Sequence, residues 1–400
     1  MTTRKPKEAT GSVESKSMNR TLDNARAAKK DEFYTQYVDI QKEVEAYIEL
    51  DPDTFRGKVV YCNCDDPFES NFFKYFAANF NKLGLKKLIT TSYDGSPIAG
   101  AQLTFGEYDE GKSKRQRPQA IALAIEVVKD INGDGATGIE DVKLFLERNP
   151  HTRTPLAGGG DFRSTECVAL LKEADIVVTN PPFSLFREYA AQVVEYGKKF
   201  LIIGNTNAIT YKEVFPLVKD NRMWLGCTNF NVGMFFEVPA HWERFHHINA
   251  ETGRKIARVS TSCWYTNLDH GRRHQQLPLM TMADNLRFSK HKEIKGKAGY
   301  DHYANYDAIE VPFTDAIPND YDGAMGVPIT FLDKYNPDQF EIIGSNLTVG
   351  TPISSIAPKG SYSPGGPSFY IDNGNGTYDR VYTRIVIRHR SSKPARKNKK

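Results

Sequence analysis

The chain has 400 residues, of which 40% are hydrophobic and 26% are charged, so it can bury the core of one large elaborated domain or of two domains. Its formal net charge of +4 does not by itself mark a nucleic-acid-binding protein. The sequence contains neither an apolar run of about 18 residues nor a secretory signal, which argues against a membrane partner and predicts a cytoplasmic protein. Its five cysteines include no CxxC pair, which argues against a disulfide framework and a zinc ribbon.

Residues 1–28 are polar and lack periodicity, which predicts a disordered N-terminal arm. A helical pattern follows over 38–50, and from there strand and helix patterns alternate. We expect strands at 58–63, 86–92, 175–180 and 200–205, and helices at 70–84, 184–199 and 211–220. This alternation predicts an α/β fold with a doubly wound, mostly parallel sheet, in which ligands bind outside the carboxyl ends of the strands.

The pattern weakens beyond residue 228 into short strands, turns and aromatic side chains, so we expect a second region over 229–390. Within it, residues 251–300 hold ten lysines and arginines against four acidic residues. That window is a candidate phosphate-facing surface, although a solvated face has the same pattern. The last segment, 391–400, is basic and is expected to be a disordered tail.

The expected strand at 175–180 runs directly into Asn180, Pro181, Pro182 and Phe183, and a helix pattern follows. The two prolines fix the backbone and bring no amide hydrogen, so the carbonyl groups around them form a rigid set of acceptors. A strand-to-helix turn with proline near the helix start is the plainer interpretation. The position at the end of a buried strand, where such sheets bind ligands, favours a catalytic role.

Acceptors of this kind suit chemistry on an exocyclic amine, whose lone pair is delocalised into a base. The side-chain oxygen of Asn180 and the carbonyl of Pro181 can accept the two amine hydrogens and draw the nitrogen toward tetrahedral geometry. Phe183 would stack on a base that has left the duplex. The motif therefore predicts catalysis through Asn180, Pro181, Pro182 and Phe183.

A strand that ends in [DNS]-P-P-[FYW] resembles the signature of methyltransferases that act on adenine N6 or cytosine N4. Six segments together resemble the EcoRI-type adenine-specific DNA methyltransferase family over most of residues 30–390: DEFYTQYVDIQKEVEAYI, VVYCNCDDPFESNFFKYF, GGGDFRS, VVTNPPFSLFREY, FLIIGNTNAITYKEVFPL and GVPITFLDKYNPDQFEIIG. The resemblance implies a Rossmann-like methyltransferase sheet with an S-adenosylmethionine-binding catalytic domain over 29–228 and a mixed α/β target-recognition region over 229–390.

The resemblance further implies methyl transfer from S-adenosylmethionine to adenine N6 in double-stranded DNA, with base flipping, in restriction-modification or as an orphan methylase. A cognate restriction endonuclease would act separately, and a monomer is favoured. Three alternatives stay open: an RNA adenine methyltransferase, a DNA cytosine-N4 methyltransferase, and a catalytically silent DNA-binding relative.

The resemblance also implies cofactor-binding positions. Phe33, Tyr34 and Thr35 match the segment near the methionine part of the cofactor, and Asp161 and Phe162 match the segment that receives the adenine ring. The segment after the first strand supplies five more candidates, which are Asn63, Asp65, Asp66, Pro67 and Ser70. This segment lacks the glycines usual in the family, which weakens the case for close backbone approach.

Each cofactor segment has a plainer interpretation. Phe33 to Thr35 can be a turn before a helix, Asp65 to Pro67 a helix N-cap with proline in the first turn, and Asp161 the cap of a glycine-rich turn. An acidic residue that binds the cofactor ribose is expected after the second strand, but the sequence there offers only Thr91, Ser92 or, further on, Asp94, so this contact stays unassigned.

Residues 130–141 resemble a calcium-binding loop. Asp130, Asn132, Asp134 and Asp141 stand at loop positions one, three, five and twelve, and Gly135 stands at position six. A turn rich in Asp and Gly with incidental acids explains the pattern equally well. A bound calcium would be structural, since methyl transfer requires no metal.

The segment 263–279 combines aromatic, amide and guanidinium groups that suit base edges and phosphates. Arg272 and Arg273 are its candidate DNA-binding residues. A polar strand and turn packed on the core is the alternative.

Overall fold

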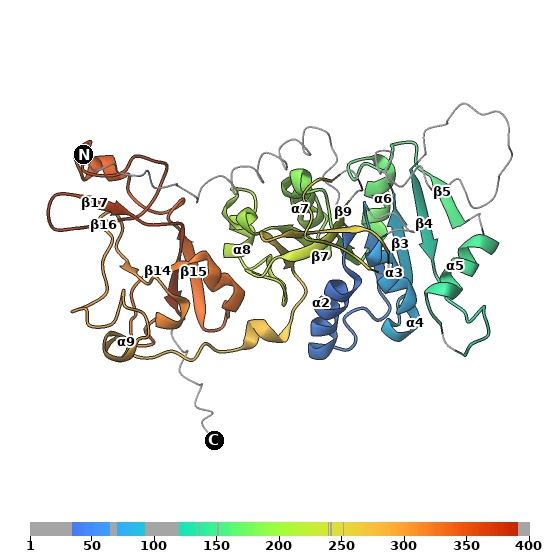
Figure 1. The fold of residues 1–400 in the computed structure, drawn as a ribbon, viewed down its shortest axis with the longest axis horizontal. Coiled ribbons are helices and arrows are strands. Elements are labelled where there is room, and N and C mark those ends of the chain that lie inside the picture. Colours follow the sequence, from blue (N-terminus) through green and yellow to red (C-terminus); the bar gives the residue numbers. More distant parts are fainter. Residues whose placement is uncertain are drawn as a thin grey trace, which may run out of the picture.

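The computed structural model describes residues 34–64, 70–92, 120–135, 137–149, 152–238, 240, 242–250 and 252–390. A large sheet with helices on both faces lies at one end of an elongated molecule, and a smaller C-terminal region lies at the other end (Figure 1). The predicted arm at 1–28 and tail at 391–400 fall outside the described residues. Among the described helices, none has the length and apolar character needed to cross a bilayer.

The large sheet has eight strands in the order β5-β4-β3-β2-β6-β7-β12-β8. Its four central strands pair in parallel and are β2 (Val59–Cys62), β3 (Lys87–Thr91), β6 (Ile176–Thr179) and β7 (Lys199–Asn205). The four outer strands join antiparallel and are β4 (Ile121–Ile125), β5 (Arg153–Pro155), β8 (Trp224–Leu225) and β12 (Ser262–Thr266). The α/β class is confirmed, whereas the mostly parallel pairing holds for the centre only.

Helices cover both faces of this sheet because alternate residues of its strands are apolar on both sides. One face packs against α2 (Tyr37–Leu50), α3 (Asn71–Ala78), α4 (Phe80–Leu83) and α5 (Ile139–Arg148). The other face packs against α6 (Thr165–Glu173), α7 (Phe186–Glu195) and α8 (Phe215–Lys219). Figure 1 shows α2 on one side of the sheet and α6 and α7 on the other.

A small antiparallel sheet stands beside the large one, in the order β1-β9-β11-β10. It joins β1 (Tyr34–Thr35) to β9 (Met234–Val238), β10 (His247–Ile248) and β11 (Lys255–Val259). The expected boundary after residue 228 does not separate two sheets, because β12 follows these strands in the chain and returns to pair with β7. The N-terminal residues 34–35 likewise pair with strand β9 about two hundred positions later.

The C-terminal region holds a four-stranded sheet in the order β13-β14-β18-β15 and a two-stranded ribbon. Their bounds are β13 (Ile309–Glu310), β14 (Met325–Pro328), β15 (Phe340–Ser345), β16 (Tyr370–Asp372), β17 (Tyr378–Arg380) and β18 (Arg384–His389). One α-helix, α9 (Met282–Phe288), leads into it. A buried ion pair between Arg384 and Glu310, with a 2.6 Å N–O distance, ties β18 to β13, and the Tyr303 hydroxyl also donates to Glu310.

Short 3₁₀ helices connect several of these elements. They are η3 (Phe183–Leu185), η4 (Thr206–Thr210), η5 (Gly271–His274), η6 (Thr314–Ala316), η7 (Ile329–Lys334) and η8 (Ile353–Ser355).

Candidate active site

The Asn-Pro-Pro-Phe motif lies at the carboxyl end of β6, as expected. Strand β6 ends at Thr179, and η3 begins at Phe183. Pro181 is buried, while Asn180, Pro182 and Phe183 are half-buried. The chain order reverses here, because β3 lies on one side of β2 and β6 lies on the other. The motif therefore occupies the position in the sheet where ligands of open α/β sheets bind.

The helix after the motif is held close to β7 by a glycine. A Cβ atom added at Gly204 would lie 2.4 Å from the ring of Phe186, the first residue of α7. That ring also packs against Tyr265 of β12, with centroids 5.1 Å apart. Only glycine at position 204 permits this approach, which fixes the start of α7 and with it the motif.

Buried polar side chains link the carboxyl ends of β2, β3 and β6. The Thr91 hydroxyl donates to Asn63 Oδ1 at 2.8 Å, and the Tyr61 hydroxyl lies 3.1 Å from Thr91 Oγ1. The Thr179 hydroxyl donates to the backbone carbonyl of Asn63. All four residues are buried, and we call them the polar floor. Since Thr179 directly precedes Asn180, the floor joins the predicted cofactor residue Asn63 to the predicted catalytic asparagine.

The predicted N-terminal cofactor segment meets the same edge of the sheet. The side-chain amide of Asn71 donates to the Thr35 carbonyl at 2.7 Å, and Ser70 caps α3 by accepting from the Phe72 and Phe73 amides. Thr35 pairs with Phe236 of β9, whose ring meets that of Phe183 edge-on at 6.1 Å. The structure thus brings Tyr34–Thr35, Ser70, Asn63 and the motif together.

Several predicted cofactor residues cannot be placed. Phe33, Asp65, Asp66 and Pro67 lie outside the described residues. The segment 65–69 is entered through Cys64, whose backbone has a left-handed φ of 59°, uncommon for a residue other than glycine. The chain therefore turns sharply after Asn63, where the family's glycine-containing segment would begin.

The second predicted cofactor segment has internal contacts. The Phe162 ring is buried and packs edge-on against Tyr189 of α7, at 5.2 Å. Asp161 is half-exposed and its carboxylate binds the Arg163 guanidinium at 2.7 Å. The turn before them is fixed by Glu166, which accepts from the Ala157 and Gly158 amides, and these hydrogen bonds lower the pKa of Glu166. The capped glycine-rich turn is therefore present, and the cofactor role of these two residues stays a prediction.

Some residues of the site were not assigned from the sequence. Thr179 lies outside the four-residue motif, although it directly precedes Asn180 and its hydroxyl donates to the Asn63 carbonyl. Thr91 and Ser92, two candidates for ribose binding, are buried and used internally, since Ser92 Oγ accepts from the Ile121 amide. Phe236 lies at the site because β9 pairs with β1, which is far away in the chain, and a single sequence gives no signal for such pairing.

A buried carboxylate supports the loop after β8. Glu43 of α2 is fully buried and accepts hydrogen bonds from the Cys227 amide at 2.7 Å, the Thr228 amide and hydroxyl, and the Tyr47 hydroxyl. Burial raises the pKa of Glu43 despite these donors. A Cβ atom at Gly226 would lie 2.2 Å from Glu43 Oε1, so the glycine is required for this contact.

The calcium-like loop binds its own backbone. Asp141 accepts from the Ile131 amide at 2.7 Å, the Asn132 amide and the Gly138 amide, and these hydrogen bonds lower its pKa. Asp130 accepts from the Gly133 and Gly135 amides, and Asn132 from the Asp134 amide. Among the residues described, no group of three or more His, Cys, Asp or Glu side chains could hold a metal. The calcium prediction is not supported, and the turn interpretation accounts for these four residues.

The two predicted DNA-binding arginines are engaged within the protein. Arg273 is 7% exposed; its guanidinium lies 3.5 Å from the Trp224 ring centroid and donates to Asn221 at 2.5 Å. Arg272 donates to the Cys227 carbonyl and binds Asp333 of η7 at 2.5 Å. These contacts agree with the alternative of a polar turn packed on the core, and the DNA contact of the two arginines stays a prediction.

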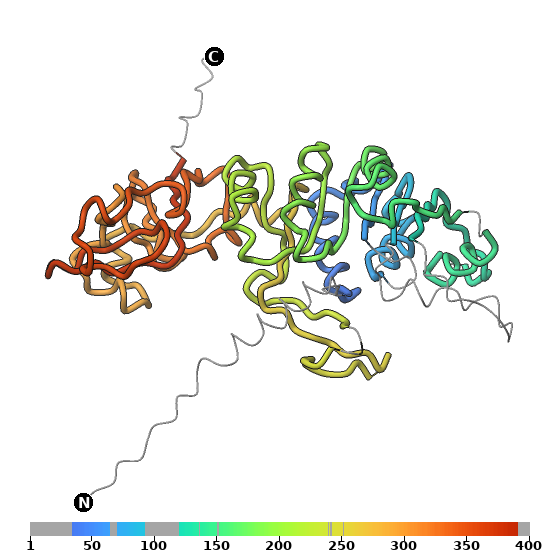
Figure 2. Tube along the Cα trace, turned by 90° about the horizontal axis from the view of Figure 1, so that it is seen from above, coloured from blue at the N-terminus to red at the C-terminus, as the bar shows by residue number. Residues whose placement is uncertain are grey.

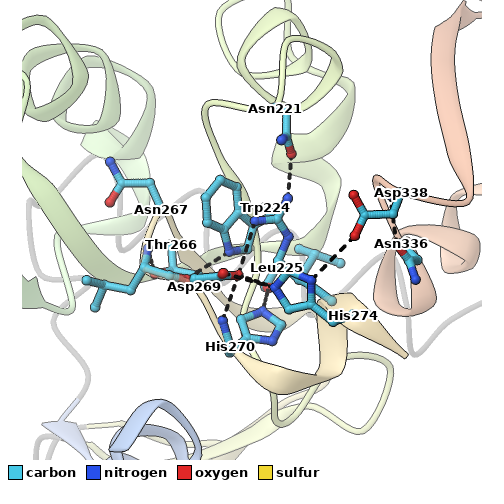
Figure 3. Close-up of polar contacts among 12 residues, drawn as sticks. Asn221, Trp224, Leu225, Thr266, Asn267, Asp269, His270, His274, Asn336 and Asp338 are labelled. Carbon is cyan, nitrogen blue, oxygen red and sulfur yellow. Dashed lines mark hydrogen bonds and ion pairs between the residues drawn. The ribbon is translucent and has the colours of Figure 1, made fainter. Parts of the chain in front are cut away.

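The same turn joins the large sheet to the C-terminal region. His274 of η5 lies 2.9 Å from Asp269 and 3.6 Å from Asp338, and Figure 3 shows these side chains converging on the junction. His270 is buried beside it and contacts the Leu225 carbonyl through Nε2 at 3.0 Å. Burial lowers the pKa of His270 to about 4, so this imidazole is neutral at physiological pH.

A mixed α/β sheet that presents Asn-Pro-Pro-Phe at its switch point, beside a buried polar floor, is the arrangement of an amino-methyltransferase. The chain belongs to the EcoRI adenine-specific methyltransferase family. The family described as "Adenine-specific methyltransferase EcoRI" matches residues 21–390, which confirms the resemblance seen in the sequence.

Curated relatives agree with this assignment. The chain is 46% identical over 347 residues to the type II methyltransferase M.EcoRI of Escherichia coli, covering 86% of this chain and 94% of the relative. It is 33% identical over 376 residues to the type II methyltransferase M.MpnI of Mycoplasma pneumoniae, covering 93% and 98% of the two chains. It is also 33% identical to M.MgeORF184P of Mycoplasma genitalium over 326 residues. No solved structure matches the chain.

Proposed function

We propose that this enzyme transfers a methyl group from S-adenosylmethionine to the N6 amine of adenine at a specific sequence of double-stranded DNA, in a restriction-modification system. The observation that carries this proposal is the position of Asn180 and Pro181 at the carboxyl end of β6, beside the polar floor, in a member of an adenine-specific family. The relatives' names as type II methyltransferases support the restriction-modification setting. A cognate endonuclease would act separately, and the methyltransferase would act as a monomer.

The residues at the switch point fit the cofactor. In the described part of the chain, the Thr35 hydroxyl is buried and has no hydrogen-bond partner, a state that costs free energy unless a ligand completes it. Asn63 and Ser70 lie at the same edge, and the central parallel strands support a Rossmann-like arrangement. When bound, the cofactor supplies a methyl group on a positively charged sulfonium.

The motif holds the acceptor amine. The amide oxygen of Asn180 is buried, and Pro181 is buried beside it, so both oxygens act in surroundings from which water is largely excluded. They accept the two hydrogens of the adenine amine and free the nitrogen lone pair for attack. After transfer the methylated nitrogen carries one proton too many, and that proton passes to water, because the two amide oxygens accept hydrogen bonds but are too weakly basic to take it. Phe183, backed by Phe236, stacks on the flipped base.

Target recognition belongs to the chain beyond residue 228. We place base reading in 229–390 and catalysis in 29–228, with β12 as the strand of the later segment that completes the catalytic sheet. Because β12 belongs to the sheet, it would hold the target-recognition region in a fixed position relative to the catalytic residues.

The test is methyl transfer from labelled S-adenosylmethionine to unmethylated genomic DNA, with RNA as a parallel substrate and nucleoside analysis of the products. We expect N6-methyladenine in DNA. Label in RNA alone, N4-methylcytosine in DNA, or no transfer at all would contradict the proposal and would favour, in turn, the RNA enzyme, the cytosine enzyme and the silent relative.

A further inference from the structure

The hairpin made by β9, β10 and β11, which we call the β9–β11 hairpin, extends away from the body of the molecule (Figure 2). Its base forms part of the site. Phe236 of β9 is fully buried, pairs with Thr35 and meets the Phe183 ring. The hairpin therefore starts beside Phe183 of the motif, and a duplex that delivers adenine to Asn180 would pass close to it.

The two faces of the hairpin differ. The inner face packs into the core through Met234, Phe236, Val238, Ala257 and Val259. On the outer face, the Phe235 ring lies 5.3 Å from His246 and 6.3 Å from His247. Two large apolar side chains near the tip are exposed, Phe245 by 41% and Ile248 by 54%. Gathered apolar side chains with a polar rim mark an interaction surface, whereas scattered ones do not.

The basic residues of the hairpin shape its tip. Residues 234–259 hold four lysines and arginines against three acidic residues, and Arg254 is paired with Glu237 at 3.0 Å. Lys255 donates to the Ala240 and Trp242 carbonyls and lies 5.1 Å from the Phe245 ring centroid. Arg258 stands opposite Phe235 and donates to the Val232 carbonyl. The tip therefore exposes apolar side chains, and hydrogen bonds from Lys255 and Arg258 support the backbone around them. The ribbon that carries the tip has an excess of positive charge, which suits a polyanion.

We propose that the β9–β11 hairpin is a DNA wedge, in which Phe245 and Ile248 press on the base stack beside the target adenine and fill the space that the flipped base leaves. The proposal rests on the proposed function, because a flipped adenine creates that space. The projecting tip of this antiparallel sheet would enter a DNA groove, and inserted apolar side chains offset the loss of stacking between base pairs. The contact between Phe236 and Phe183 links wedge and pocket, so the two act on the same nucleotide step.

The test is the double variant Phe245→Ala/Ile248→Ala, compared with unchanged protein and with Phe288→Ala on α9, another exposed apolar side chain at 57%. Methyl transfer is measured on a matched duplex and on a duplex with a mismatch opposite the target adenine, where extrusion is easier. We expect kcat/KM of the double variant to fall about tenfold or more on the matched duplex and only about twofold on the mismatched one. Cofactor affinity and thermal unfolding should match the unchanged protein, and the Phe288 variant should lose nothing.

Three results would overturn the wedge: full activity of the double variant, equal losses on both duplexes, or lower thermal stability together with weaker cofactor binding. Failure of the proposed function is distinguishable, because it would be seen in the unchanged protein as absence of methyl transfer to any DNA. Failure of the wedge would be seen only in the double variant.

Discussion

Asn63 and Asn180 follow the two strands between which the sheet reverses its order, and they have different tasks. Asn63 is buried and its side-chain oxygen already accepts from the Cys64 amide and the Thr91 hydroxyl, so its orientation is fixed. Asn180 is half-buried at the entry to the helix. Asn63 is part of the polar floor, Asn180 is the proposed acceptor of the amine, and Thr179 connects the two residues.

Replacing Asn180 by alanine removes one of the two acceptors that hold the amine. We expect Asn180→Ala to lower kcat by roughly 10² to 10³, as loss of one preorganised hydrogen-bonding group does in other active sites. Cofactor affinity should stay close to that of the unchanged protein, since the cofactor residues lie on other strands. Single-turnover methyl transfer and calorimetric cofactor binding measure the two quantities, and equal activity in this variant would rule out the assigned role.

Thr179 allows a more selective test of the polar floor. Thr179→Val keeps the shape and removes the hydroxyl, which leaves the buried Asn63 carbonyl without this donor, at a cost of about 1–3 kcal/mol. We expect weaker cofactor binding and slower transfer in Thr179→Val and recovery of both in Thr179→Ser. Chemical denaturation separates loss of stability from loss of function. If the serine variant were as impaired as the valine variant, the hydroxyl would not be the relevant group.

Among the elements, the loop at 130–141 is stabilised by the carboxylate of Asp141, which accepts hydrogen bonds from three backbone amides of the loop. Since hydrogen bonds lower the pKa of folded Asp141 below its ordinary value of 3.8, its stabilisation is present above that value and is lost as the pH falls through the folded pKa. The protection factors of the Ile131 and Gly138 amides, which correct for the pH dependence of intrinsic exchange, should therefore fall as the pH drops below 3.8. Asp141→Asn should exchange faster at neutral pH with a flatter acid dependence, and added calcium should protect neither protein. Protection by calcium would restore the metal interpretation.

Local periodicity predicted most elements of the catalytic half. The expected strands at 58–63, 175–180 and 200–205 appear as Val59–Cys62, Ile176–Thr179 and Lys199–Asn205. The sequence did not predict which strands pair with each other. The strand Ser262–Thr266 is buried throughout, yet nothing local shows that it returns to β7 after a small sheet has intervened. Antiparallel partners far apart in the chain leave no periodic signal.

The residues of the candidate site also fall into two groups, those that a local pattern predicts and those that only contacts between strands bring to the site. Asn180 to Phe183 and Asn63 could be found because a motif and a strand end are local features. Thr179, Thr91 and Phe236 belong to the site through contacts between strands, which residue order alone does not give. Arg273 shows the same limit, since a guanidinium in a basic, aromatic segment suggests DNA, whereas its stacking on Trp224 inside the protein is a contact that the sequence does not reveal.

For the molecule as a whole, the junction around Arg273 joins the large sheet to the C-terminal region. Arg273→Met should keep part of the packing on Trp224 but leave Asn221 without its donor and remove one of the partners of Asp269, and we expect a loss of about 1–3 kcal/mol in unfolding free energy. The salt dependence of DNA binding should not change, whereas loss of a phosphate contact would reduce its slope by about one. Urea unfolding and binding at several salt concentrations check both statements. A reduced slope would return Arg273 to the DNA interface.

The pairing of Tyr34–Thr35 with β9 bears on how the protein is made. During synthesis the first strand of the site leaves the ribosome long before its partner, at about 5–20 residues per second. The catalytic sheet is completed later still, when β12 arrives. The cofactor pocket therefore closes late in translation, and a nascent chain that stops before residue 262 would carry the whole Asn-Pro-Pro-Phe motif without a finished enzyme around it.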